Sequence, residues 1–265
     1  MKKIIAFSLW GDIPLYIEGA VKNIELAKIV YPDWVCRFYI PAGISKITNN
    51  MKPNNHSSDD KQYKITTVPT NIIQKLKELG AEVIEINEDG CWYSMFWRFY
   101  AIENSDIAIF RDCDSRLSFR EKNAVDEWVN SNEKVHIMRD HPWHGAPILG
   151  GMWGIKKGIM DDMKTKIIKF IEYKKKTSPS VGYWQCDQDF LKLCYPVLLR
   201  SAMIHDDWGG RHFDTISRPF PKKRYKNQYV GQPYDENNKT LITLGGEMKK
   251  NTNTINEIFE LDELV

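Results

Sequence analysis

Two carboxylates stand one residue apart directly after a short apolar run, and this pattern could hold a metal ion. Residues 107–110 are all apolar, and Asp112 and Asp114 follow them. A buried strand of an α/β sheet appears as an uninterrupted apolar run, and ligands of such sheets bind beyond the carboxyl ends of the strands. Two carboxylates suit Mg²⁺ or Mn²⁺, which complete their coordination with water and phosphate oxygens. The pattern therefore indicates a metal site that takes a diphosphate.

An isolated Asp-x-Asp triplet is a weak signal, because most such triplets are turn residues exposed to solvent. The chain holds a second triplet, which begins at Asp187 and ends at Asp189. That one also fits the first turn of a helix, where carboxylates are favoured. For the first triplet, the preceding apolar run and the neighbouring Arg111 and Arg116 favour a functional role, because guanidinium groups keep carboxylates ionised and bind phosphate.

Apolar positions along the chain alternate between the periodicity of strands and that of helices. Such alternation predicts an α/β fold with a Rossmann-like, mostly parallel sheet flanked by helices. Strands are expected at 4–10, 34–40, 81–86, 107–110, 135–138 and 152–155, and helices at 12–31, 71–79, 93–104, 118–129, 161–173 and 188–195.

The length of 265 residues and the ordinary apolar fraction predict one large domain. We expect that domain to span residues 1–234, with a polar surface excursion at 48–70 and a polar tail at 235–265. A net charge of +2 gives no overall field that would recruit nucleic acid. Five cysteines without a Cys-x-x-Cys pair favour a reducing compartment. Because no membrane span or signal peptide is predicted either, the expected location is the cytoplasm.

Further motifs accompany the first triplet. They are, in chain order, Arg98, Asp112-Cys113-Asp114, the glycine-containing stretch 150–154, and Asp187-Gln188-Asp189-Phe190-Leu191. This series resembles the GT-A glycosyltransferases and is most similar to retaining enzymes of the glycosyltransferase family 8 type. Residues 110–153 also resemble uncharacterised putative glycosyltransferases of bacteria and large viruses. The resemblance extends over residues 1–230 and rests on the order of motifs that are individually weak.

The resemblance implies a nucleoside diphosphate sugar as donor, with a uridine diphosphate sugar as the first expectation, and Mn²⁺ or Mg²⁺ as cofactor. Asp112 and Asp114 would bind the ion. The third metal ligand would be either His205, which ends an apolar run, or His212, whose surroundings match a family motif in part; we favour His205. The donor-binding residues that the resemblance implies are Phe7, Ser8, Tyr16, Arg98, Arg111, Cys113, Gly150, Gly151 and Arg218.

Several of these residues also have purely structural interpretations. Arg98 could be an ordinary surface residue of its helix. The glycines at 150 and 151 could serve tight packing beside Trp153 instead of the approach of a sugar to the backbone. The aromatic residues of the segment 7–16 could belong to the core and not contact a base.

The resemblance further implies that Asp187 and Asp189 act near the reacting sugar. One would bind its hydroxyls, and the other would orient the acceptor or, in an inverting enzyme, remove its proton. Asp140, His141 and Trp143 precede the glycine stretch and offer groups that suit sugar hydroxyls and rings. We therefore expect these three residues to bind the acceptor, which is a glycan or another molecule with a hydroxyl.

The sequence thus predicts a metal-dependent enzyme that moves a sugar from a nucleoside diphosphate to an acceptor hydroxyl in glycan synthesis. The resemblance implies retention of configuration. Two other functions remain open at this point. An aspartyl-nucleophile phosphatase would use Asp112 to attack and Asp114 to protonate the leaving group. A protein with the same fold could also bind nucleotide sugars without turnover.

Overall fold

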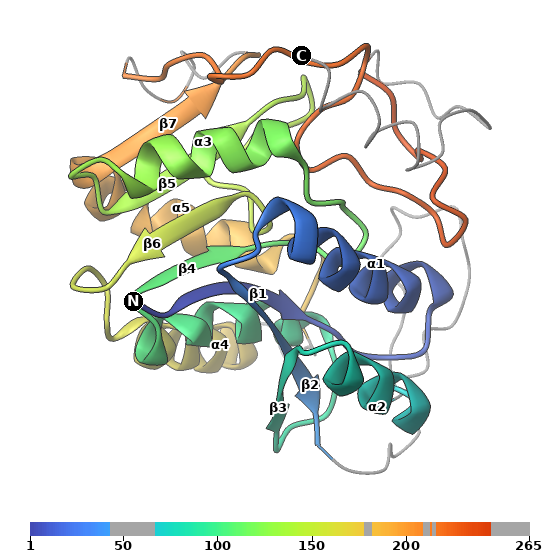
Figure 1. Ribbon diagram of the computed structural model, residues 1–265. Helices are drawn as coiled ribbons and strands as arrows, with labels where there is room; N and C mark the ends of the chain where they lie inside the picture. Colours follow the sequence, from blue (N-terminus) through green and yellow to red (C-terminus); the bar gives the residue numbers. More distant parts are fainter. Residues whose placement is uncertain (43–66, 178–181, 209–212, 214–215, 245–265) are drawn as a thin grey trace.

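The computed structural model describes residues 1–42, 67–177, 182–208, 213 and 216–244, and Figure 1 shows their arrangement. One sheet contains the strands β1 (Lys3–Ser8), β2 (Val35–Pro41), β3 (Glu82–Ile86), β4 (Ile107–Phe110), β5 (Val135–Arg139), β6 (Trp153–Lys156) and β7 (Ala202–Asp206). The helices are α1 (Pro14–Val30), α2 (Thr70–Glu78), α3 (Phe119–Val129), α4 (Met163–Thr177) and α5 (Cys186–Leu198), with the 3₁₀ helices η1 (Trp92–Asn104) and η2 (Leu199–Ser201).

The sheet is parallel except at one strand. Its order is β3-β2-β1-β4-β6-β5-β7, and β6 runs antiparallel to both of its neighbours. The other pairs, β1 with β2 and β4, β2 with β3, and β5 with β7, are parallel. The predicted α/β fold with a mostly parallel, helix-flanked sheet is confirmed. Six strands therefore end, and β6 begins, at the same edge of the sheet, which we call the carboxyl edge.

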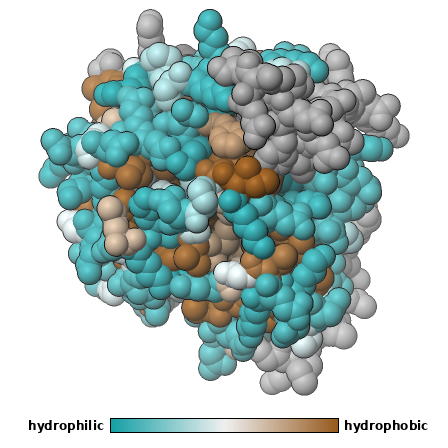
Figure 2. Space-filling view, viewed as in Figure 1, coloured by the Kyte–Doolittle hydropathy of each residue, from teal (hydrophilic) through white to brown (hydrophobic). Residues whose placement is uncertain are grey.

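Helices cover both faces of the sheet (Figure 1). One core cluster joins α1, α2 and α3 to residues such as Phe7 and Phe38. The other joins η1, α4 and α5 to Phe110 and Trp153. Successive residues of a strand point to opposite faces, so β1, β2, β4 and β7 supply both clusters. Figure 2 shows a mainly hydrophilic surface with scattered hydrophobic patches, as expected when most apolar side chains lie between sheet and helices.

Three details differ from the sequence prediction. The segment 93–104 is helical as predicted, but the helix is of the 3₁₀ type. The terminal strand β7 was not predicted as part of the sheet and lies beside β5. Residues 235–244 do not begin a separate tail, because Arg116 donates to the Asn238 Oδ1 (3.1 Å) and the His141 Nε2 bonds the Thr243 carbonyl (2.9 Å).

Two further predictions concern residues that lie largely outside the described part of the chain. Most of the expected excursion at 48–70 lies outside the described residues, and so does the tail beyond residue 244. Among the described residues, no helix has both the length and the apolar character needed to cross a bilayer.

Candidate active site

Segments far apart in the sequence meet at the carboxyl edge next to β4. The Asp112–Asp114 triplet follows β4, Ser8 ends β1 on one side of it, and Gly150 and Gly151 precede β6 on the other. These three segments are neighbours because β4 pairs with both β1 and β6. The helices η1 and α5, which cover one face of the sheet, bring Arg98 and Asp187 to the same place.

Arg98 lies at the centre of a buried ionic cluster. Its Nη1 donates to the Asp112 Oδ1 and to the Arg111 carbonyl (3.2 Å), and its Nη2 donates to the Asp187 Oδ2 (2.6 Å). Burial opposes the charge of Arg98, but Asp112 and Asp187 outweigh this effect and raise its pKa. Arg98 is thus no ordinary surface residue of a helix. We call Arg98, Asp112 and Asp187 the Arg98 cluster.

The two glycines before β6 leave room for the carboxylates of this cluster. A Cβ at Gly150 would lie 2.0 Å from the Asp187 Oδ2, and a Cβ at Gly151 would lie 1.9 Å from the Asp112 Oδ2. No side chain could occupy either position without moving a carboxylate. The glycines therefore allow two carboxylates to approach the backbone, whereas the sequence predicted that they leave space for a sugar.

Helix α1 holds the loop that carries the Asp112–Asp114 triplet. Asn23 of α1 donates to the Ser115 carbonyl (2.9 Å) and accepts from the Leu117 backbone N–H (3.2 Å). Gly19 allows close approach, since a Cβ there would lie 1.9 Å from the Cys113 carbonyl. Sequence reasoning missed both residues. The available signal was a polar residue on the apolar side of a helix, because Asn23 is buried among the core residues of α1.

Solvent reaches the carboxylate of Asp112, and the pKa of Asp114 is shifted. The Asp112 side chain is 48% exposed, whereas those of Arg98 and Asp187 are 5% and 3% exposed. Burial and the nearby charge of Asp112 raise the pKa of Asp114 to about 7. A divalent cation would relieve this repulsion, and Mg²⁺ commonly takes only one or two carboxylates from a protein. The chemistry of the pair therefore fits a divalent cation.

The expected third metal ligand does not join the pair. His205 is buried in β7 and shares a hydrogen bond with His136 (2.8 Å between Nδ1 and Nε2), while its Nε2 contacts the Glu127 Oε2 (3.2 Å). Strands β6 and β5 lie between β4 and β7. Among the described residues, no three His, Cys, Asp or Glu side chains are grouped to hold a metal ion. The placement of His205 is therefore corrected to a structural one, and His212 falls outside the described residues.

Arg218 also lies at the far side of the sheet. Its backbone N–H donates to the Ile204 carbonyl of β7 (2.9 Å), and its Nη1 donates to the Glu127 Oε1 (3.0 Å). Like His205, it is separated from the Asp112–Asp114 triplet by two strands. The prediction that Arg218 assists the diphosphate beside that triplet is not supported by this position.

The carboxylates of the second triplet have separate partners. Asp187, in the first turn of α5, is buried, and its Oδ1 accepts from the Gln188 backbone N–H (2.9 Å) while its Oδ2 accepts from Arg98. Burial raises the pKa of Asp187, and Arg98 partly offsets this effect. Asp189 is exposed and accepts from the Tyr183 hydroxyl (2.5 Å). Of the two, the structure therefore brings only Asp187 into the Arg98 cluster.

Two of the predicted donor-binding residues are engaged in the interior. Phe7 is fully buried and stacks on Phe38, with ring centroids 4.8 Å apart. Arg111 is buried, donates to the Glu121 Oε1 (2.7 Å) and donates to the Trp153 carbonyl (3.1 Å). Neither side chain is available to a base or a diphosphate, so both assignments are corrected to structural roles.

The remaining predicted donor-binding residues lie close to the triplet or on α1. The Ser8 hydroxyl accepts from the Arg98 backbone N–H (3.0 Å) and donates to the Met95 carbonyl (3.3 Å), so Ser8 fixes η1 against β1. Cys113 is buried, and burial raises the pKa of its thiol. Tyr16, in the first turn of α1, is 37% exposed.

The predicted acceptor residues are mostly committed to internal contacts. Asp140 is fully buried and accepts from Arg120 (Nε to Oδ2, 2.9 Å), from Arg224 and from the Val230 backbone N–H (2.9 Å). We call these four residues the Asp140 network. Because no lone pair of Asp140 faces solvent, its assignment to acceptor binding is corrected to a structural one.

His141 and Trp143, the other two residues predicted to bind the acceptor, have different environments. His141 bonds the Thr243 carbonyl and packs on Tyr229, with ring centroids 4.3 Å apart. Its role is therefore to hold the C-terminal segment, which also corrects the prediction. Trp143 is 58% exposed and remains available to a ligand.

The chain shares little sequence with characterised proteins. No model of a protein family matches it, and no curated protein matches it in sequence. Its structure is similar to that of a glycosyltransferase involved in the glycosylation of the major capsid of PBCV-1, with 12% identity, a TM-score of 0.45, and coverage of 78% of this chain and 82% of that one.

Two further solved structures resemble the chain at a similar level. The first is glucosyl-3-phosphoglycerate synthase from Mycobacterium tuberculosis, with 9% identity, a TM-score of 0.39, and coverage of 84% of this chain and 73% of that one. The second is the galactosyltransferase LgtC, with 13% identity, a TM-score of 0.40, and coverage of 77% of this chain and 73% of that one.

Proposed function

We propose that the protein is a glycosyltransferase of the GT-A type, which transfers a sugar from a nucleoside diphosphate donor to an acceptor hydroxyl with the help of Mn²⁺ or Mg²⁺. A uridine diphosphate sugar is the first donor to test. The observation that carries the proposal is the pair Asp112 and Asp114 at the carboxyl edge, with one carboxylate half-exposed and a buried guanidinium behind it. Ligands of open α/β sheets bind at such an edge.

The Arg98 cluster prepares Asp112 for a ligand. Arg98 holds the Oδ1 of Asp112, and the glycine at 151 leaves the space that the Oδ2 fills. The carboxylate is thereby fixed before any ligand arrives, so less conformational entropy is lost on binding. When bound by Asp112 and Asp114, the ion would offset the negative charge that develops on the leaving diphosphate.

Asp187 acts in this proposal as a positioning residue. Both of its oxygens are engaged, one by Arg98 and one by the Gln188 backbone N–H, and the side chain is 3% exposed. It is therefore a poor candidate for the base that an inverting enzyme needs to deprotonate the acceptor. This supports retention, in which the acceptor attacks from the side of the leaving group. NMR of the product linkage tests it, since an inverted anomer would favour Asp189 as the base.

The proposal is tested with a panel of nucleoside diphosphate sugars, with and without Mn²⁺. A ligand that binds only the folded state raises the melting temperature. We expect one donor to do so in a metal-dependent way and to be turned over to free nucleoside diphosphate. The variant Asp112→Asn should lower that turnover about 100-fold or more, because it removes charge from the metal site. Asp89→Asn, a change at an exposed residue, is the matched control.

Other results would contradict the proposal in distinguishable ways. If no nucleotide sugar changes the melting temperature or is turned over at any metal concentration, the transferase assignment is wrong. Release of phosphate from an aryl phosphate, abolished by Asp112→Asn, would instead identify a phosphatase. Binding of a nucleotide sugar without hydrolysis or transfer, across a broad acceptor panel, would identify a binding protein.

A further inference from the structure

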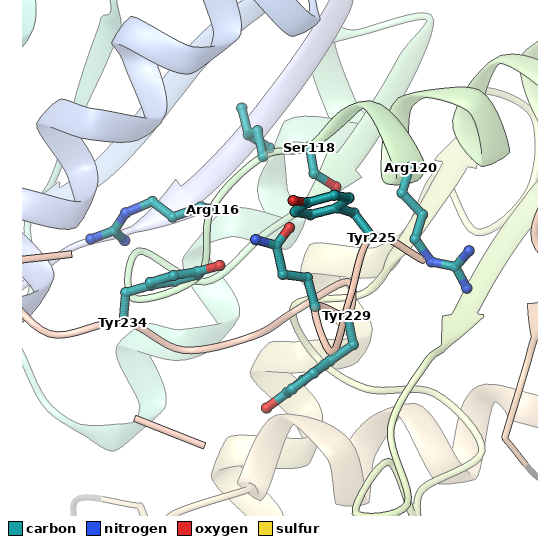
Figure 3. Close-up of a pocket in the computed structure, with 8 residues that line it drawn as sticks. Arg116, Ser118, Arg120, Tyr225, Tyr229 and Tyr234 are labelled. Carbon is teal, nitrogen blue, oxygen red and sulfur yellow. The ribbon is translucent and has the colours of Figure 1, made fainter. Parts of the chain in front are cut away.

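A hollow lies next to the Asp112–Asp114 triplet in the chain, where α3 begins. It is formed by the residues that precede and begin α3 and by the C-terminal segment 225–234, and its empty volume, counted out to the solvent, is about 430 Å³. Figure 3 shows Tyr225 and Ser118 near its middle and Tyr229 and Tyr234 along its side. We call it the tyrosine pocket. Of its residues, only Arg116 was suggested by the sequence as a ligand-binding group, for phosphate.

The two arginines of the tyrosine pocket do not offer their charge to a ligand. Arg116 donates to the carbonyls of Cys113 and Ser115 (3.2 and 2.9 Å) and to Asn238 (3.1 Å). In Figure 3 the guanidinium groups of Arg116 and Arg120 point away from the middle of the pocket, in opposite directions. A diphosphate, which needs free or bidentate cationic donors, is therefore poorly matched to this surface.

The guanidinium of Arg120 is equally engaged. It donates to both carboxylate oxygens of Asp140 (2.9 and 2.8 Å), to Asp207 (2.6 Å) and to the Lys222 carbonyl. These contacts leave none of its nitrogens unpaired. The arginines thus build the walls of the pocket and fix the C-terminal segment against α3.

The uncommitted groups of the pocket are neutral. Within the described part of the chain, the Tyr225 hydroxyl and the Gln228 side-chain amide make no hydrogen bond, and both residues are only partly buried. The ring of Tyr229 and that of Tyr234 are buried and held in place, the latter with Arg116 5.4 Å from its centroid. The accessible Tyr225 ring, with its hydroxyl and the free amide of Gln228, suits a ring that has apolar C–H faces and hydroxyl edges, which describes a sugar.

The pocket is connected directly to the candidate active site. The Tyr234 backbone N–H donates to the Asp114 carbonyl (2.8 Å), and Ser115 pairs with Pro233 in a β-bridge. Arg116 of the pocket follows Asp114 by two residues. A transferase must hold two substrates in contact at the reaction centre, and a site next to the metal-binding pair meets that need.

We propose that the tyrosine pocket binds a neutral saccharide unit of the acceptor. Tyr225 and Gln228 bind its hydroxyls, and the partly buried ring of Tyr225 contacts one of its apolar faces. This assignment of the acceptor rests on the proposed transferase function, whereas the binding of a neutral sugar to the pocket does not. Because the pocket is small and partly open, the remainder of a longer glycan would extend into solvent.

The first test is binding of methyl glycosides of the common hexoses, pentoses and 6-deoxyhexoses, measured by saturation-transfer-difference NMR. We expect at least one to bind the full-length protein, and its Kd to rise about tenfold or more in Gln228→Ala and in Tyr225→Ala, since each removes a hydrogen-bonding group. Asn227→Ala removes an exposed amide from the same turn and should leave the Kd unchanged. Circular dichroism of each variant verifies folding.

A competition experiment separates this site from the donor site. We expect UDP with Mn²⁺ to leave the glycoside signal in place. The inference is overturned if no glycoside binds, if both pocket variants bind as the wild type does, or if UDP displaces the glycoside.

Failure of the transferase function has a different signature. It would appear as glycoside binding that depends on Gln228 while no nucleotide sugar is turned over by the wild type. The wild type could also turn over a donor while both pocket variants bind the glycoside unchanged. That result would support the transferase function and show that the tyrosine pocket is not its acceptor site.

Discussion

Two buried arginine–aspartate groups lie at the same edge of the sheet and differ in how completely their atoms are used. In the Asp140 network the carboxylate is 0% exposed, and it accepts from two guanidinium groups and a backbone N–H. In the Arg98 cluster the Asp112 carboxylate is 48% exposed, and the buried Nε of Arg98 has no hydrogen-bond partner among the described residues. We call the Asp140 network the closed group, because its carboxylate is inaccessible to a ligand, and the Arg98 cluster the open group, because the Asp112 carboxylate is accessible.

The contrast shows that residue chemistry alone does not identify a site. Both groups contain Arg and an Asp that closely follows a strand, Asp112 after β4 and Asp140 after β5, and the sequence suggested ligand binding for both aspartates. A carboxylate with all of its lone pairs satisfied inside the protein fastens chain segments, here the segment around Val230 to the start of α3. A carboxylate held on one side only keeps an oxygen for a ligand.

The largest expected effect concerns the closed group. Asp140→Ala leaves Arg120 and Arg224 without their shared carboxylate in the interior, and loss of one partner from a buried ionic group costs about 3–5 kcal/mol. Urea unfolding at pH 7 measures this change in the free energy of unfolding. Asp89→Ala, at an exposed residue, should change it by no more than about 0.5 kcal/mol. If Asp140→Ala lowers the free energy of unfolding by less than about 1 kcal/mol, the Asp140 network does not stabilise the fold as expected.

The next effect concerns Gly151, whose missing side chain leaves the space that the Asp112 carboxylate occupies. In Gly151→Ala the new Cβ would meet the Asp112 Oδ2, so the carboxylate must shift. We expect donor turnover to fall about 100-fold, since misplacement of a reacting group by about 1 Å has such an effect. The control is Gly145→Ala, where a Cβ would meet nothing within 4 Å. Equal turnover in the two variants would argue against a fixed Asp112.

The smallest effect tests whether the open group reduces stability. The pKa of Asp114 is raised to about 7 in the folded state, so ionisation is harder in the folded than in the unfolded chain. Without divalent cations the wild type therefore loses stability as the pH rises from about 4 through 7. Asp114→Asn cannot ionise and should be the more stable protein at pH 8 by about 1 kcal/mol or more, with a gap that closes toward pH 4. Chemical unfolding in EDTA measures both curves, and a gap independent of pH would contradict the shift.

The sequence predicted the elements well where local patterns decide them. The apolar run before Asp112 did form a buried strand, and Ser118 did begin α3, where its hydroxyl accepts from the Glu121 backbone N–H (3.3 Å). Predictions failed where side chains are shared between distant segments. Arg111 was expected to face phosphate, yet it bonds Glu121 ten residues later, and Asp140 bonds groups up to ninety residues away.

The amino-acid sequence by itself determined the α/β class, the strand that ends at Asp112 and the candidate carboxylates, because apolar periodicity and short motifs are local properties. Only the tertiary structure decided which carboxylates stay open. It placed His205 in β7, with two strands between it and β4, closed the contacts around Asp140 and placed Asp112 and Asp187 against two glycines. The physical reason is that the availability of a lone pair depends on what every other segment places beside it, and that arrangement exists only after the chain has packed.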